Sequence, residues 1–294
     1  MKISRIFKQK TKEQLLEKAI NLKENGQIEE SIELYRKIIH LNPEWATPCY
    51  NLGLIYKYRC EWQQSFEFNQ KATELNSEDE ASWWNLGIAA TALEDWRTAR
   101  QAWNHFGLNL DINGLEPDLI MGRAPIRLNP DGNGEVVWGR RVDPARTIIE
   151  NVPLPESNHR YNDWVLNDGA PVGQRISNGI EYAVFNELQL IRPSNFKTYS
   201  AVAFVKDQAH INKLQELCAS ANIGFEDWST IRILCKQCSE GTPHEHHDHD
   251  IKPGNDGERK FGFASSNKAT LEKILIDWAT ITLSEYEKTV LELE

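Results

Sequence analysis

The chain has 294 residues, of which 40% are hydrophobic and 26% charged, and its formal net charge is −10. This composition is typical of a globular protein with room for two or three domains. The acidic balance does not favour a nucleic-acid partner, because phosphate binding needs a basic surface. No run of about 18 apolar residues is present, so no membrane span is expected. The basic start lacks the apolar run of a signal peptide, and the five cysteines do not form a disulfide framework. We therefore expect a cytoplasmic protein with reduced thiols.

A strict 34-residue period runs through the first third of the chain. Each period reads as two amphipathic helices, and a small residue in the first helix allows close approach to a neighbour. Three such units can together bury an apolar face that one unit cannot bury alone. The recurring positions are Ala19, Gly53 and Gly87; Leu52 and Leu86; Trp62 and Trp96; and Ser31, Ser65 and Ala99.

Over about residues 12–108, this period and these residue types resemble the tetratricopeptide repeat (TPR) family. The resemblance implies three stacked helix pairs whose first helices line a concave groove that binds a protein or peptide. It also implies that asparagines at the positions of Asn51 and Asn85 hold the backbone of an extended peptide. The lysine and arginine pattern that grips a C-terminal carboxylate in chaperone-binding members is missing. The expected groove residues are Leu16, Ile20, Tyr50, Asn51, Leu54, Trp84, Asn85 and Ile88.

An apolar groove has two interpretations. A contiguous apolar patch usually marks a binding surface, which favours a free groove. However, a terminal repeat normally needs a polar cap, and no capping helix is apparent after Phe106. The alternative interpretation is therefore that the C-terminal half of the same chain fills the groove.

Residues 111–195 are predicted to form a β-rich domain after a turn-rich linker. Short alternating segments suggest a meander or a small, partly open barrel, for example of the OB type. Eight arginines and no lysine lie between Ile112 and Phe196, which suits internal ion pairs better than an anion site. The expected strands are Ala124–Leu128, Glu135–Arg141, Arg146–Val152, Asp163–Asn167 and Glu181–Ile191.

Residues 196–294 are predicted to form an α/β sandwich, because strands and helices alternate there; a ferredoxin-like arrangement is one option. Helices are expected at Gln208–Asn222 and from Lys268 to Leu283. Strands are expected at Thr198–Val205, Ser229–Leu234 and Lys260–Ser265. Within the first helix, Cys218 shares an apolar face with Leu214, which predicts a core position.

A cysteine and histidine cluster lies between the last two expected strands. Cys235 and Cys238 have the C-x-x-C spacing that can chelate one ion, and His244 and His246 could complete the tetrahedron that zinc prefers. His247 and His249 are the alternative ligands. A solvated loop without metal and a catalytic zinc are the rival interpretations.

The sequence thus predicts an α plus α/β protein of three domains, residues 1–110, 111–195 and 196–294. We expect a protein-interaction scaffold or adaptor that binds a partner through the groove, with a structural zinc in the last domain. The second hypothesis is a metal-handling or zinc-dependent enzyme. The third is nucleic-acid binding through the arginines of the β-rich domain.

Overall fold

The computed structural model describes residues 2–132, 134–205, 207–230 and 257–294, with the backbone alone for residues 2–11. The chain divides into two compact units, Met1–Pro117 and Asp118–Glu294. The expected division between residues 195 and 196 falls inside the second unit and stays a prediction. Within the described part of the chain, no helix combines the length and the hydrophobicity of a membrane span.

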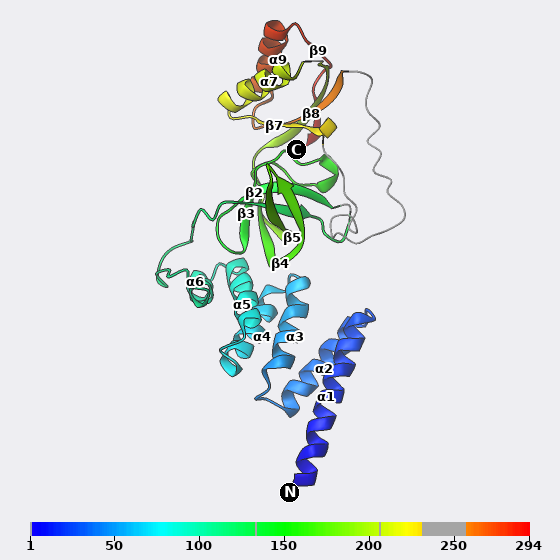
Figure 1. Ribbon diagram of the computed structural model, residues 1–294, viewed down its shortest axis with the longest axis vertical. Helices are drawn as coiled ribbons and strands as arrows, with labels where there is room; N and C mark the ends of the chain where they lie inside the picture. Colours follow the sequence, from blue (N-terminus) through cyan, green and yellow to red (C-terminus); the bar gives the residue numbers. More distant parts are fainter. Residues whose placement is uncertain (1, 133, 206, 231–256) are drawn as a thin grey trace. The chain divides into compact units, whose positions relative to one another are not determined.

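The first unit is an array of three helical hairpins, as the period predicts (Figure 1). A short turn joins the two helices of each hairpin, and their apolar sides meet in a shared core that includes Tyr35, Leu52 and Tyr56. The helices are α1 (Lys2–Glu24) with α2 (Ile28–Leu41), α3 (Ala46–Tyr58) with α4 (Trp62–Leu75), and α5 (Glu80–Ala92) with α6 (Trp96–His105).

The recurring small residues are where paired helices come closest. A Cβ atom added to Gly53 would lie 2.6 Å from the Asn69 amide nitrogen, and one added to Gly87 would lie 2.5 Å from the Trp103 ring. This is the close approach that the sequence predicts for these positions. A larger residue at either position would force the two helices of its hairpin apart.

A repeated hydrogen bond accompanies this approach. The Ser31 hydroxyl donates to the carbonyl of Ala19 at 2.7 Å, and the Ser65 hydroxyl donates to that of Gly53 at 3.0 Å. The third unit has no hydroxyl at the equivalent Ala99. There, Thr91 donates to the Gly87 carbonyl from within the same helix, at 2.7 Å.

An irregular segment after α6 lies against that helix. Arg100 donates from Nη1 to the carbonyl of Asp111 at 3.0 Å and from Nε to that of Leu115 at 3.1 Å. Asn104 donates to the carbonyl of Leu110 at 2.8 Å. In the described chain no helix follows α6 within this unit, so this segment takes a position where a capping helix would be expected.

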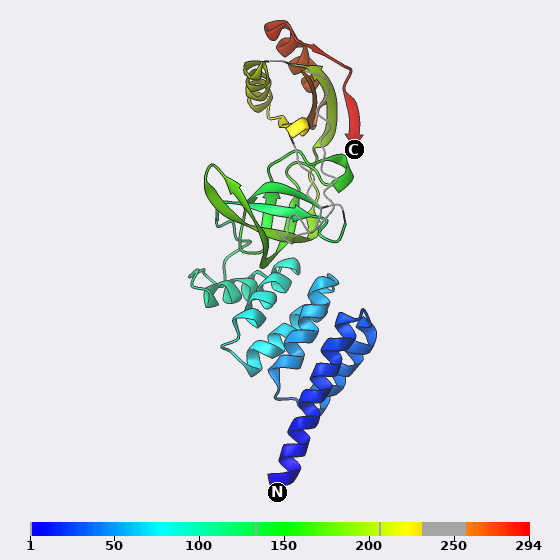
Figure 2. The same cartoon turned by 45° about the vertical axis from the view of Figure 1, so that its right-hand side comes forward.

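The second unit begins with a meander of consecutive antiparallel strands. The strands β1 (Arg123–Leu128), β2 (Glu135–Arg141), β3 (Arg146–Ile149), β4 (Trp164–Ser177) and β5 (Ile180–Arg192) pair in order. β1 also pairs with β5 in parallel, which closes the sheet into a barrel around Ile126, Val137 and Val165 (Figure 2). The strand order is a meander and not the Greek key of an OB fold.

β4 runs well past the segment that the sequence predicts, whereas β5 matches its predicted bounds to within one residue at each end. The tripeptide Asn167-Asp168-Gly169 is predicted to be a turn, but the strand continues through it with register shifts. Side chains repair the broken ladder: Asn167 Nδ2 donates to the Asp168 carbonyl, and Asp168 Oδ1 accepts from the Gly169 N–H at 2.7 Å. The turn residues therefore form a bulge.

The rest of the second unit is a sheet covered on one face by two helices. The sheet order is β10-β6-β8-β7, with β9 paired to β6, and the neighbouring strands are antiparallel. Cys218, Leu275 and Trp278 pack from the helices against Phe261 and Phe263 of the sheet. The elements are β6 (Lys197–Phe204), α7 (Gln208–Ser220), β7 (Gly224–Asp227), β8 (Glu258–Ser265), α9 (Lys268–Thr282), β9 (Glu285–Tyr286) and β10 (Val290–Leu293).

Trp228 joins this sheet to the barrel segment. It lies in the short 3-10 helix η2 (Trp228–Thr230) and donates from Nε1 to the carbonyl of Val152 at 2.9 Å. A Cβ added to Gly262 would lie 2.2 Å from the indole, so only glycine leaves room for it. The strand predicted at Ser229–Leu234 is wrong for residues 229 and 230, which belong to this turn; residues 231–234 lie outside the described residues.

Candidate functional site

The candidate site is the face formed by the first helices of the three hairpins, α1, α3 and α5, which we call the first-helix face. Six of the eight predicted groove residues are partly exposed on it, whereas Asn85 and Ile88 are buried, at 4% and 0% exposure. Leu16 and Ile20 also pack against the core of the first unit. The partly exposed residues are Leu16, Ile20, Tyr50, Asn51, Leu54 and Trp84.

A buried lysine links the second helix hairpin to the third. Lys57 on α3 is 3% exposed, and its Nζ donates to Asn85 Oδ1 on α5 at 3.1 Å. The ammonium also lies 4.5 Å from the centre of the Tyr58 ring. A buried ammonium needs such polar neighbours, so Asn85 has a packing role that the partly exposed Asn51 does not share. The two asparagines occupy equivalent positions of the 34-residue period, so the sequence does not indicate this difference.

Trp84 combines packing with an unused hydrogen-bond donor. Its ring contacts those of Trp103 and Phe106 edge to face, with centroids 5.4 and 4.9 Å apart. Its Nε1 is buried and has no acceptor among the described residues. A buried indole N–H normally finds an acceptor, and the Nε1 of Trp103 in the same cluster also has none among the described residues, so both donors belong to the packed core and are closed to a ligand.

An apolar pocket that the sequence does not predict lies beside this face. It has a volume of about 390 Å³ and is formed by α1, α2 and α3 and the residue that follows α3. Arg59 at its rim is already neutralised, since its Nη1 and Nε lie 2.5 Å from carboxylate oxygens of Glu29 and Glu61. The pocket can therefore accept an apolar side chain. Its lining is Lys23, Ile28, Glu29, Ile55, Tyr58 and Arg59.

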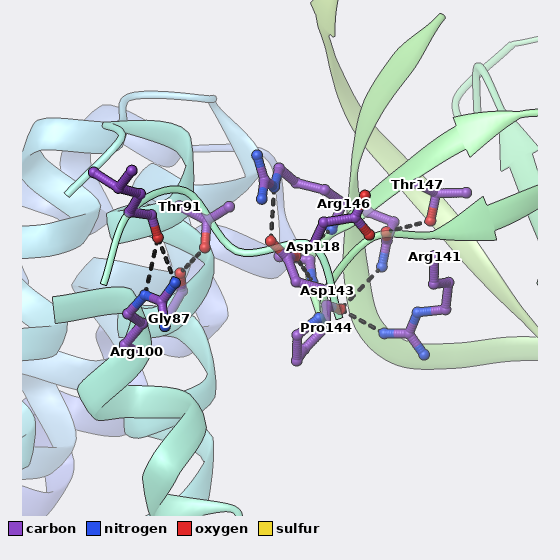
Figure 3. Close-up of polar contacts among 12 residues, drawn as sticks. Gly87, Thr91, Arg100, Asp118, Arg141, Asp143, Pro144, Arg146 and Thr147 are labelled. Carbon is purple, nitrogen blue, oxygen red and sulfur yellow. Dashed lines mark hydrogen bonds and ion pairs between the residues drawn. The ribbon is translucent and has the colours of Figure 1, made fainter. Parts of the chain in front are cut away.

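The arginines of the barrel segment mostly make contacts within their own unit. Arg146 and Asp143 form a fully buried pair at 2.7 Å (Figure 3), and Arg123 pairs with Glu150 at 2.5 Å. Arg141 donates to the carbonyl of Pro144 at 2.5 Å. These contacts agree with the internal ion pairs that the sequence favours over an anion site.

The predicted zinc ligands lie outside the described residues. Cys235, Cys238, His244 and His246, and the alternatives His247 and His249, all fall within residues 231–256. Among the described residues, no group of three or more histidine, cysteine, aspartate or glutamate side chains could hold a metal ion. Cys218 is buried in the core as predicted, and burial raises the pKa of its thiol to about 12, which keeps it unreactive.

No family model and no curated protein matches the chain. The second TPR of Spaghetti (RPAP3) bound to HSP90 peptide SRMEEVD is 19% identical, with a TM-score of 0.33. That match covers 37% of this chain and 98% of the other. A hypothetical protein from Neisseria gonorrhoeae is 14% identical over 59% of this chain and 96% of its own, with a TM-score of 0.25. Likenesses this low carry no argument about function, which must come from the residues of the chain itself.

Proposed function

We propose that the first unit is a TPR-type array that binds an extended segment of another protein along the first-helix face, so that the chain works as an interaction adaptor. The 34-residue period and the close helix approaches at Gly53 and Gly87 support the TPR assignment. The observation that carries the binding proposal is the group of partly exposed apolar and amide side chains on the first-helix face, Tyr50, Asn51 and Leu54.

The chemistry of this face suits a peptide in an extended conformation. Such a peptide presents backbone carbonyls and N–H groups to the partly exposed Asn51 amide, which can donate as well as accept. Its apolar side chains would cover Leu16, Ile20 and Leu54. The neighbouring apolar pocket provides a place for a larger side chain.

Affinity measurements on variants test this function. A partner recovered with the full chain is identified and its affinity measured against Tyr50→Ala and Asn51→Ala. We expect Tyr50→Ala to weaken binding by on the order of 2 kcal/mol, about thirtyfold, as loss of an aromatic anchor does. Asn51→Ala removes an amide that can bind a peptide backbone, and should weaken binding by about 1 kcal/mol.

Lys37→Ala provides the matched control, because Lys37 is exposed on the second helix α2. Affinity equal to wild type in all the face variants, with their fold intact, would reject the first-helix face as the binding surface. A loss of stability across both units in the same variants would indicate that the face packs against the chain's own C-terminal half.

We also propose that Cys235, Cys238, His244 and His246 bind one zinc ion with a structural role. Their spacing and the soft sulfur and imidazole donors support this, since both ligand types favour zinc. Elemental analysis of untagged protein should find about one zinc per chain, and Cys235→Ser should lose it. Wild-type protein that is folded and free of metal would contradict the proposal. The rival metal-dependent enzyme would instead show turnover that needs the ion.

A further inference from the structure

A buried histidine in the second unit has both ring nitrogens against acceptors. His159 lies just after the 3-10 turn η1 (Pro155–Ser157) and is 5% exposed. Its Nδ1 is 2.7 Å from the carbonyl oxygen of Ser157. Its Nε2 is 2.6 Å from Oε1 of Glu187 on β5, which is 7% exposed.

This geometry requires a proton between Nε2 and the carboxyl group, and with Glu187 ionised that proton makes the ring positively charged. A carbonyl oxygen can only accept, so Nδ1 must carry a proton. A neutral ring would then turn the lone pair of Nε2 towards an ionised carboxylate at 2.6 Å. A second proton on Nε2 removes this repulsion and gives a charge-assisted hydrogen bond.

The same two residues hold three segments of the barrel unit together. Glu187 Oε2 accepts from the backbone N–H of Asn129, in the turn after β1, at 3.1 Å. The Ser157 carbonyl accepts from Asn129 Nδ2 at 2.8 Å as well as from the histidine. Asn129 and Ser157 both line a pocket of about 520 Å³, so the pair fixes two of its walls.

The charged groups around the ring come from each neighbouring element. Glu187 faces it from β5, Asp163 from the residue before β4, and Glu135 from β2; Arg160 follows it in the chain. Burial alone would lower the pKa of His159. The hydrogen bond to Glu187 and the charges of Glu187 and Asp163 outweigh burial and raise that pKa above its ordinary value of 6.5.

We propose that His159 and Glu187 form a pH-sensitive latch, which holds the turn after β1 against η1 while His159 is protonated and releases it when the proton leaves. Because the folded-state pKa of His159 is raised, the stabilisation is complete below the ordinary histidine pKa. It is lost as the pH rises through the raised value. The latch therefore opens towards alkaline pH.

Hydrogen exchange of the full chain tests the latch. Protection factors, corrected for the intrinsic effect of pH, are measured between about pH 6 and pH 9 for peptides covering residues 123–132 and 150–163. We expect protection in wild type to fall several-fold across this range, because opening of the latch exposes these amides. Unchanged protection would overturn the proposal.

Glu187→Gln separates the latch from simple packing. The glutamine amide can donate to a neutral Nε2, its oxygen can accept from Asn129, and Nδ1 still donates to Ser157. Every hydrogen bond is kept without a titrating pair, so protection should fall clearly less with pH than in wild type. The same fall in this variant as in wild type would overturn the proposal.

Two further variants isolate the group that titrates. Glu181→Gln changes an exposed glutamate on the same strand and should leave the fall intact. Glu135→Gln removes a neighbouring buried carboxylate whose own ionisation lowers stability in this range, so it should reduce the fall without abolishing it. Loss of the fall in Glu135→Gln alone would assign it to Glu135 and contradict the latch. As a direct readout, the His159 ring resonance should titrate above pH 6.5, the ordinary value for histidine, and titration at or below it would also contradict the latch.

Discussion

The turns between paired helices place one residue of each repeat in the left-handed region of backbone space. Gly26, Cys60 and Glu94 follow each other at intervals of 34 residues, with φ of 77°, 56° and 57°. Only glycine adopts this conformation without steric cost. The period of the sequence is thus also a period of backbone conformation, although just one of the three positions has the residue that the turn prefers.

Cys60→Gly and Glu94→Gly should each stabilise the protein by about 0.5–1 kcal/mol, because glycine relieves the left-handed strain. Urea denaturation of the full chain measures the free energy of unfolding. Cys60→Ala is the matched control: it removes the thiol but keeps the Cβ, so it should not stabilise. Equal effects of Cys60→Gly and Cys60→Ala would show that the thiol matters and the backbone does not.

Glu135 is a buried carboxyl group whose surroundings favour its protonated form. It is 7% exposed on β2 and accepts from the Leu154 N–H at 3.0 Å. Burial, assisted by the charges of Glu226 and Glu156, raises its pKa from 4.5 to about 7. The folded chain therefore binds this proton more tightly than the unfolded chain, and stability falls as the pH rises from 4.5 towards 7.

Glu135→Gln keeps the acceptor for Leu154 and cannot ionise. We expect it to raise the free energy of unfolding by about 2 kcal/mol at pH 8 and to have little effect near pH 4. Denaturation at both pH values gives the comparison. A variant that is less stable than wild type at pH 8 would show that the ionised carboxylate makes a stabilising interaction that exceeds the cost of its burial.

Among the helices, the close packing of each of two hairpins depends on a glycine in its first helix. A methyl group at Gly87 would lie 2.5 Å from the fully buried Trp103 ring, whereas one at Gly53 would meet the amide of Asn69, a smaller side chain. Gly87→Ala should therefore cost about 2–3 kcal/mol, and Gly53→Ala less. Thermal unfolding of the two variants gives this ranking, and the reverse order would contradict the packing of α5 on α6.

The periodic elements could be predicted from the sequence, because each buries one side at a regular spacing. The strand Glu135–Arg141 has the predicted bounds, and Cys218 is a core residue as expected. β7 could not be predicted, since Gly224–Asp227 is a short edge strand with partly exposed polar residues and no alternation. The extension of β4 was hidden by turn residues that form a bulge instead.

The candidate site could be predicted in outline but not in detail. The 34-residue period identifies the face and most of its partly exposed residues. It does not indicate that Asn85 accepts a hydrogen bond from Lys57, because that bond joins α3 to α5 between residues 28 positions apart in the sequence. The edge-to-face packing of Trp84 depends on Phe106, which lies beyond the last helix and outside the periodic pattern.

At the scale of the whole molecule, the segment after α6 has a role in the first unit. Residues 109–117 carry the carbonyls that Arg100 and Asn104 bind, and the unit boundary lies after Pro117. A fragment of residues 1–117 should therefore unfold cooperatively and be more stable than one of residues 1–108 by on the order of 1–3 kcal/mol. Equal stability of the two fragments would mean that the segment is a passive linker.

The central claim, that the first-helix face binds another protein, is tested most directly by photo-crosslinking from that face. Tyr50 is replaced by benzoylphenylalanine in the full chain, the crosslink is formed in cells, and the attached peptide is sequenced. We expect a peptide from another protein, with no such product when the same group replaces Lys37 on α2. A crosslink from position 50 to residues 118–294 of the same chain, and to no other protein, would contradict it.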